Sequence, residues 1–161
     1  MKKLSKINEG LWKSGIERSK TGTERLEDKP NTNIEELKEI DLYDDLPFVF
    51  ADNDIKVNGE SKMDGDVFWL CKKEIEKSGW RVPTINDLEK LGDIIDGDID
   101  EWSSVYKRLE FDWRYTYFIL DGRGYLQTYD MGKLGKSYYY TNDPKKSELY
   151  KIRPIKDKSK L

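Results

Sequence analysis

Residues 80–91 read Trp80-Arg81-Val82-Pro83-Thr84-Ile85-Asn86-Asp87-Leu88-Glu89-Lys90-Leu91, and this stretch decides the fold. Pro83 keeps the residue before it out of the α region, so an extended segment leads into a helix. Thr84 is suited to cap that helix, because Asp87 follows at the spacing of a capping box. A buried stripe at helical spacing is then formed by Leu88, Leu91, Ile94 and Ile95. The stretch predicts a helix that ends at Asp96-Gly97-Asp98.

The residues before this stretch predict a second helix and a strand. Residues 67–77 are amphipathic and stop at Ser78-Gly79, a common helix end. We expect their buried face to contain Val67, Leu70, Cys71 and Ile75, with Cys71 as a small core filler. Leu46–Ala51 is typical of a buried strand, and Asn33 is suited to cap a short helix over Ile34–Ile40.

The residues after the stretch predict a β region. Trp113–Leu120 and Tyr125–Tyr129 are β-branched and aromatic, and Asp121-Gly122-Arg123-Gly124 between them is a strong hairpin signal. Tyr150–Ile155 predicts a closing strand, placed at a sheet edge or strand end by Pro154. The fold class expected is α+β, with two helices packed on a small, mostly antiparallel sheet with hairpins and long loops.

The composition excludes several kinds of chemistry. The 161 residues contain no His and only one Cys, so no Ser-His-Asp or Cys-His triad, no zinc site of the His or paired-Cys kind and no internal disulfide can form. We therefore predict no catalytic residues, no metal and no cofactor. The net charge of −3 predicts no nucleic-acid partner, and no apolar run is long enough for a membrane span. No signal peptide is visible at the N-terminus.

Residues 1–38 differ from the rest of the chain. They are polar and dense in Lys and Glu, with few apolar residues, so they cannot form a core of their own. We expect them to be an arm that attaches the domain to another molecule; a frayed terminus is the alternative. Residues 158–161 form a short charged tail.

Four separate pieces of the chain resemble, in order, the signature of a known family. These pieces are residues 40–55, the stretch Trp80–Leu91, Trp102-Ser103-Ser104, and Tyr150–Asp157. Together they resemble a large paralogous-domain family of gut bacteria and their phages, the Bacteroidetes/Fibrobacter-type major paralogous domain, over residues 39–157. That family is similar to C-type lectin-like and formylglycine-generating-enzyme folds.

The resemblance implies a C-type lectin-like domain after the N-terminal arm. The residues that carry it have a structural interpretation: Trp80, Arg81, Pro83, Thr84, Trp102 and Arg153. We expect Trp80 to be buried, Arg81 to clamp backbone carbonyls or a carboxylate, and Thr84 to cap its helix.

Tyrosines are the candidate binding residues. Strand alternation places Tyr115 and Tyr117 on one face, and Tyr138, Tyr139 and Tyr140 follow a Gly-bearing loop. Tyr side chains offer rigid amphipathic contact area for proteins or sugars, although a mixed core and strand surface is the alternative. The acidic loop at 93–100 permits either a calcium site or a solvated helix end.

Two functions are compatible with these features. The first is a non-catalytic structural or adhesive phage virion protein (a capsid decoration, fibre or tail component), made in the bacterial cytoplasm. It would contact other virion proteins through the arm, and we expect a homo-oligomer that also binds a host glycan or protein. The alternative is a carbohydrate-binding lectin-like protein, secreted or at the bacterial cell surface.

Overall fold

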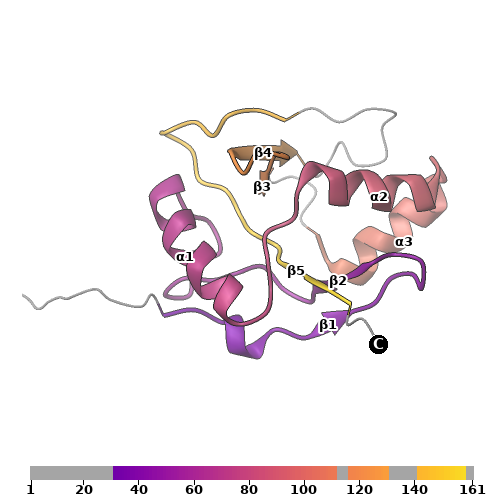
Figure 1. Ribbon diagram of the computed structural model, residues 1–161, viewed down its shortest axis with the longest axis horizontal. Coiled ribbons are helices and arrows are strands. Elements are labelled where there is room, and N and C mark those ends of the chain that lie inside the picture. The colour runs from indigo at the N-terminus through magenta and orange to yellow at the C-terminus, as the bar shows by residue number, and fades with distance from the viewer. Residues whose placement is uncertain (1–30, 112–115, 131–140, 159–161) are drawn as a thin grey trace, which may run out of the picture. The chain divides into compact units, whose positions relative to one another are not determined.

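A computed structural model describes residues 31–111, 116–130 and 141–158, and Thr32–Leu161 form one compact unit. Within the described residues the chain is α+β, with helices and two small antiparallel sheets (Figure 1). The elements in chain order are the 3-10 helix η1 (Ile34–Glu36), β1 (Glu39–Ile40), β2 (Phe48–Ala51), α1 (Gly65–Lys77), α2 (Ile85–Ile95), α3 (Ile99–Leu109), β3 (Thr116–Leu120), β4 (Leu126–Asp130) and β5 (Ile155–Asp157).

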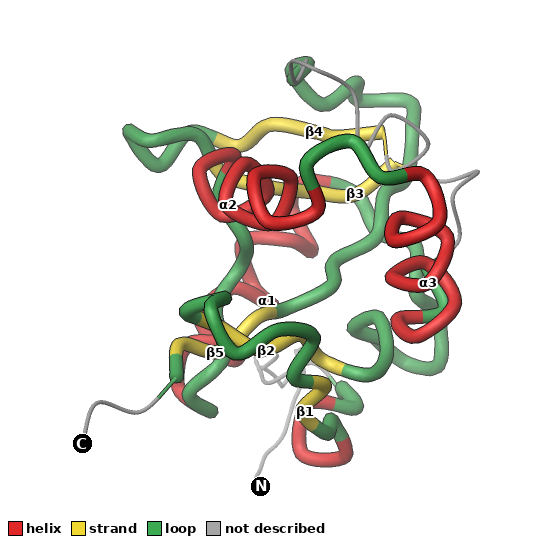
Figure 2. The backbone as a smooth tube through the Cα atoms, turned by 90° about the vertical axis from the view of Figure 1, so that its right-hand side faces the viewer, coloured by secondary structure: helices red, strands yellow, loops and turns green. Residues whose placement is uncertain are grey.

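The two sheets have simple topologies. One has the order β1-β2-β5, in which Val49 of β2 pairs with Lys156 of β5. The other is the β3–β4 hairpin, in which Phe118 pairs with Thr128. Figure 2 shows α2 beside the hairpin, with the three-stranded sheet at the opposite end of the view.

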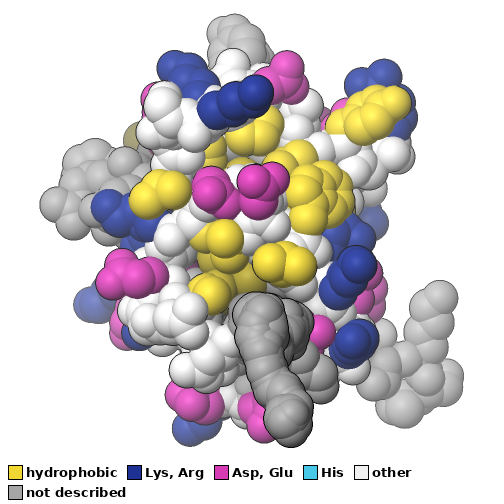
Figure 3. Space-filling model, turned by 90° about the vertical axis from the view of Figure 1, so that its left-hand side faces the viewer, with side chains coloured by type: hydrophobic (Ala, Val, Ile, Leu, Met, Phe, Trp, Pro, Cys, Tyr) yellow, Lys and Arg dark blue, Asp and Glu magenta, His cyan; other side chains and the backbone are white. Residues whose placement is uncertain are grey.

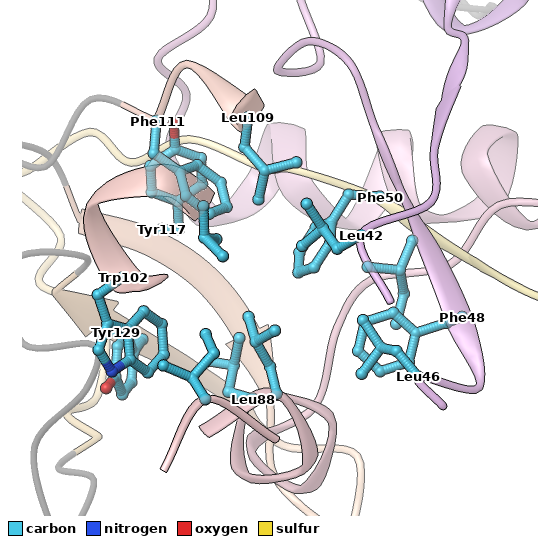
Figure 4. Close-up of a cluster of buried hydrophobic side chains, with 14 of the residues drawn as sticks. Leu42, Leu46, Phe48, Phe50, Leu88, Trp102, Leu109, Phe111, Tyr117 and Tyr129 are labelled. Carbon is cyan, nitrogen blue, oxygen red and sulfur yellow. The ribbon is translucent and has the colours of Figure 1, made fainter. Parts of the chain in front are cut away.

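The strands separate two hydrophobic cores. Phe48 and Phe50 of β2 belong to the first core, together with α2 and α3, whereas Val49 and Ala51 belong to the second, together with α1. Successive side chains of a strand point to opposite faces, so all four residues of β2 are buried. Figure 1 shows α1 on one side of the strands and α2 and α3 on the other, and Figure 4 shows the first core.

Several predicted elements are confirmed. α2 has the predicted capping box between Thr84 and Asp87, buries Leu88, Leu91 and Ile95, and ends at Asp96. The hairpin is antiparallel as predicted, although Trp113–Tyr115 at its start lie outside the described residues. The closing strand is predicted correctly as an edge strand but wrongly in its bounds: β5 covers Ile155–Asp157 and not Tyr150–Ile155, because residues 150 and 151 pair only through isolated bridges and the regular strand begins after Pro154.

The predicted buried face of α1 is confirmed at Cys71 and Ile75, and Val67 is half-buried against the second core, but the prediction is wrong at Leu70 and omits Phe68. The buried residues are Phe68, Cys71 and Ile75, whereas Leu70 is 54% exposed. Phe68 takes the inward position because its ring packs against Phe118 of the hairpin, with 4.9 Å between the ring centroids. The spacing of the apolar residues is compatible with more than one rotation of the helix about its axis. The contact between Phe68 and Phe118 fixes the rotation that is observed.

Two further predictions need correction. Ile34–Ile40 is not a helix: η1 ends at Glu36, and the side chain of Asn33 bonds instead to the Asp54 carbonyl and the Lys56 amide. The structure also contains a helix that the sequence analysis does not predict: α3 begins after Asp96, Gly97 and Asp98, the residues expected to end α2. Its signals are visible in hindsight: Asp98 caps it, and Trp102, Val105 and Leu109 are its buried residues.

The compact unit also takes in residues that the sequence pattern assigns to the arm. Ile34 is 5% exposed and belongs to the second core. Residues 32–38 therefore contribute to the folded domain. Among the described residues, no helix has the length and apolar character needed to cross a membrane.

Candidate binding face

The predicted tyrosine face is not assembled as expected. Tyr115, Tyr138, Tyr139 and Tyr140 lie outside the described residues. Tyr117 is 1% exposed, and its hydroxyl donates a 2.8 Å hydrogen bond to Oδ1 of Asp54. It is a core residue, because strand alternation turns it towards α3 and Phe111.

The signature residues Trp80 and Arg81 connect the segment before α2 with the C-terminal strand β5. Trp80 is buried, and the Lys156 ammonium lies 4.4 Å from the centre of its ring. Arg81 forms two hydrogen bonds to Asp87 (2.7 and 3.0 Å) and two to Asp157 (both 2.9 Å). Each pair is a bidentate guanidinium–carboxylate contact, so the prediction that Arg81 clamps a carboxylate is confirmed.

This clamp changes the acidity of both carboxyls. Burial alone would raise the pKa of Asp87, but hydrogen bonds from Arg81 and Thr84 outweigh burial and lower it. The hydrogen bonds from Arg81 also lower the pKa of Asp157. Both groups are therefore more stable as carboxylates in the folded chain than in the unfolded one.

Pro83 and Thr84 lie where the two sheets meet. The Leu120 amide donates to the Pro83 carbonyl at 3.0 Å, and Arg81, two residues before Pro83, forms an isolated β-bridge with Ile155. This extended segment therefore connects the hairpin with the three-stranded sheet before Thr84 starts α2. Among the described residues, the contacts of this segment are structural, since they connect the two sheets.

Arg153 lies at the centre of a buried polar network. Its side chain is 3% exposed, and its Nε is 2.9 Å from Oδ1 of Asp54. It also donates to the carbonyls of Leu109 (2.6 Å) and Ala51 (3.3 Å), so it joins the end of α3 to β2. Removing one partner of such a buried ion pair leaves the other charge uncompensated, which lowers the free energy of unfolding by about 3–5 kcal/mol.

Trp102 packs in the first core beside Tyr106, with 6.3 Å between the ring centroids. Its indole Nε1 is buried and has no hydrogen-bond partner among the described residues. Its contribution is therefore apolar contact, as the structural interpretation of the signature requires.

No reactive centre is visible among the described residues. Burial raises the pKa of the Cys71 thiol to about 11, so the nucleophilic thiolate is scarce at neutral pH. No three acidic or Cys side chains in the described part of the chain are grouped so as to hold a metal ion. In the acidic loop, Asp96 is the C-cap of α2 and Asp98 is the N-cap of α3.

Exposed apolar side chains gather instead around α1. Trp69 is 44% exposed and Leu70 54%, and both lie mid-helix. Two neighbouring segments add Tyr125 (59%) and Leu149 (56%). We call these four residues the α1 face; Figure 3 views this side of the molecule and shows hydrophobic side chains clustered in its middle.

Long-range contacts bring these three segments together. The Met63 and Tyr150 amides and carbonyls bond to each other at 2.8 and 2.9 Å, which places Leu149 near the start of α1. Leu126 lies 3.8 Å from the position of a Cβ on Gly65, which places the hairpin turn at the same end of the helix. The α1 face therefore exists only in the folded chain, because its residues come from segments far apart in the sequence.

A polar hollow borders the α1 face. It has a volume of about 450 Å³ and lies between Asp64, Gly65 and Asp66 on one side and Pro144, Lys145 and Lys146 on the other. Acidic and basic groups thus face one another across it. The hollow makes the rim of the α1 face polar, as is usual around a binding surface.

Sequence reasoning missed the α1 face because it assigned Leu70 to the core. The available signal was the run Val67-Phe68-Trp69-Leu70-Cys71, because five consecutive apolar residues go once round a helix, so that some of them must lie on its exposed side. Comparisons with protein-family models, with curated proteins and with solved structures found no match for this chain.

Proposed function

We propose that this chain is a non-catalytic structural or adhesive protein of a phage particle, built on a C-type lectin-like domain with an N-terminal attachment arm. One observation supports this most directly. The described signature residues hold the scaffold, while a group of large apolar side chains is exposed on the α1 face, where the fold does not need them.

Exposed apolar area of this kind is typical of a contact surface. Large aromatic and aliphatic side chains surrounded by polar groups mark protein interaction sites, and Trp and Tyr are the residues most often dominant in binding. The four residues come from three segments that the fold brings together. Such a surface suits a module that works by contact.

The resemblance supplies the second part of the proposal. The family that the motifs resemble includes phage members, and a virion component would meet its partners through the arm and through an exposed face. We expect the chain to copurify with phage particles.

The experiment is to purify particles from lysates of the source culture and to quantify the chain in them by mass spectrometry. Recovery at a fixed ratio to the main capsid protein, retained after a salt wash, would support the proposal. Recovery only in the free protein fraction, as a monomer, would reject it.

One observation favours the alternative function, a carbohydrate-binding lectin-like protein. Tyr125 is an exposed aromatic ring near a polar hollow, although Arg123 covers one side of it at 4.7 Å. Sugars stack on exposed aromatic rings and bond to polar neighbours. A glycan array with and without calcium separates the two functions, because reproducible sugar binding lost in Tyr125→Ala would favour the lectin.

A further inference from the structure

We propose that the α1 face binds a second copy of this chain, with the two α1 helices antiparallel across a twofold axis that passes between Trp69 and Leu70. The inference deepens the proposed function and rests on it, since it names the partner of the same contact surface. The argument depends on the order of charges along α1.

Most charges of α1 are already paired within the helix. Its three acidic and three basic residues balance, and Lys72–Glu76 and Lys77–Glu74 form ion pairs at 2.6 and 3.4 Å. Asp66 and Lys73 remain, and neither side chain forms an ion pair or hydrogen bond within the described residues. A neutral helix of this kind attracts neither an anionic lipid surface nor a nucleic acid, both of which require excess positive charge.

The two remaining charges are placed symmetrically about the exposed apolar pair. Asp66, Leu70 and Lys73 are spaced i, i+4 and i+7, so they lie along one face of the helix. The midpoint between Asp66 and Lys73 falls between Trp69 and Leu70. A twofold axis at this point therefore sets Asp66 opposite Lys73 of the second copy and Trp69 opposite its Leu70.

This arrangement is self-complementary, as a twofold interface between identical subunits must be. Each dimer contains the Asp66–Lys73 contact twice, and an apolar Trp–Leu contact lies at its centre. A parallel pairing would instead set Asp66 against Asp66 and Lys73 against Lys73. The charges therefore select the antiparallel orientation.

The area indicates a weak dimer. A stable protein interface buries about 800 Å² on each partner, and two half-exposed side chains supply only part of this. Tyr125 and Leu149 add area at the edges of the α1 face. We expect a dissociation constant in the micromolar range for the free chain, which a particle with many copies would strengthen through multivalency.

The test measures the mass of the full chain by sedimentation over a concentration series from micromolar to hundreds of micromolar. Asp66→Lys alone and Lys73→Asp alone should each raise the dissociation constant roughly tenfold, because each places two like-charge contacts in the dimer. The double variant Asp66→Lys, Lys73→Asp should restore it, since both pairs are re-formed with opposite sign. Lys107→Asp, an exposed charge on α3, is the control and should change nothing.

A second pair of variants tests the apolar centre. Leu70→Ser should abolish the dimer in this concentration range, whereas Ile99→Ser, a 78% exposed residue on α3, should leave it unchanged. Circular dichroism and the unfolding midpoint, measured on each variant, show that the fold persists.

Several results would overturn the inference. These are a monomer at every concentration, a dimer insensitive to Asp66→Lys and Lys73→Asp, and single losses that the double variant does not restore. A monomeric chain that is nevertheless found in phage particles would reject this pairing and leave the proposed function standing. A dimer that behaves as described but is absent from particles would reject the proposed function alone.

Discussion

The helices α1 and α2 are similar in length but differ in how they use their apolar residues. In α2 the large apolar side chains are buried or half-buried, its first turn has a capping box, and Arg81 ties it to the C-terminal strand through Asp87. In α1 the buried residues Phe68, Cys71 and Ile75 are sufficient to attach the helix, yet Trp69 and Leu70 are exposed. The apolar content of α2 is explained by folding, whereas the exposed apolar residues of α1 are not explained by packing within the described residues.

The largest expected effect comes from removing a buried residue of α2. Leu91 is fully buried in the first core, so Leu91→Ala should lower the free energy of unfolding by about 2–5 kcal/mol. Urea denaturation followed by circular dichroism measures this. A loss no larger than that of Leu70→Ala would remove the contrast between the two helices.

The next effect concerns acid stability and the Arg81 clamp. The folded pKa values of Asp87 and Asp157 lie below the ordinary value of 3.8, so the unfolded state binds more protons in acid. The stability that these carboxylates contribute is fully present above that value and is lost as the pH falls through their folded pKa values. Unfolding free energies measured between neutral pH and about pH 3 show how steeply stability depends on pH.

Arg81→Gln is the informative variant for this clamp. It removes the charge that lowers both pKa values, so the variant should be less stable at neutral pH and should lose less stability in acid than the original chain. Arg108→Gln, on α3, is the control, because the Arg108 guanidinium donates to the carbonyls of Asp41 and Leu42 and forms no hydrogen bond to Asp87 or Asp157. If the unfolding free energy of Arg81→Gln falls with decreasing pH as steeply as that of the original chain, Arg81 is not the group that lowers the pKa values of Asp87 and Asp157.

A smaller effect is expected at the start of α2. Thr84→Ala removes the side-chain acceptor of the Asp87 amide and should cost about 1 kcal/mol, within the range of 0.5–2 found for N-caps. Thr84→Ser keeps the hydroxyl and should retain most of the stability. Equal losses in both variants would show that the methyl group, and not the cap, matters at this position.

The smallest effect on folding is expected on the α1 face. Leu70→Ser, measured at a concentration where the chain is monomeric, should change the unfolding free energy by no more than about 0.5 kcal/mol. Thermal unfolding at low protein concentration measures this. A loss above about 2 kcal/mol would mean that Leu70 supports the fold and would remove the basis of the α1 face.

Local signals predicted several elements correctly because they act over a few residues. Pro83, Thr84 and Asp87 specify the start of α2 through backbone sterics and neighbouring hydrogen bonds. The Asp-Gly turn specifies the hairpin in the same way. These interactions need no distant partner, so they can be recognised in the sequence.

Features that depend on distant contacts were predicted poorly. The orientation of α1 depends on Phe68 meeting Phe118, and Asn33 leaves its expected capping role to bond with Lys56. Tyr117 is equally ambiguous in the sequence, since either face of a strand can be buried. Its buried position follows from packing against Phe111 in the first core, and Asp54 accepts the hydrogen bond of its buried hydroxyl.

For this protein the sequence alone determined the α+β class, the capped start of α2, the hairpin and the absence of histidine-based chemistry, since composition and short-range sterics decide them. Only the tertiary structure decided which side of α1 faces outwards and that the segments of Leu149 and Tyr125 lie near the start of this helix. The physical reason is that exposure depends on what the rest of the chain covers. That outcome is set by contacts between segments far apart in sequence.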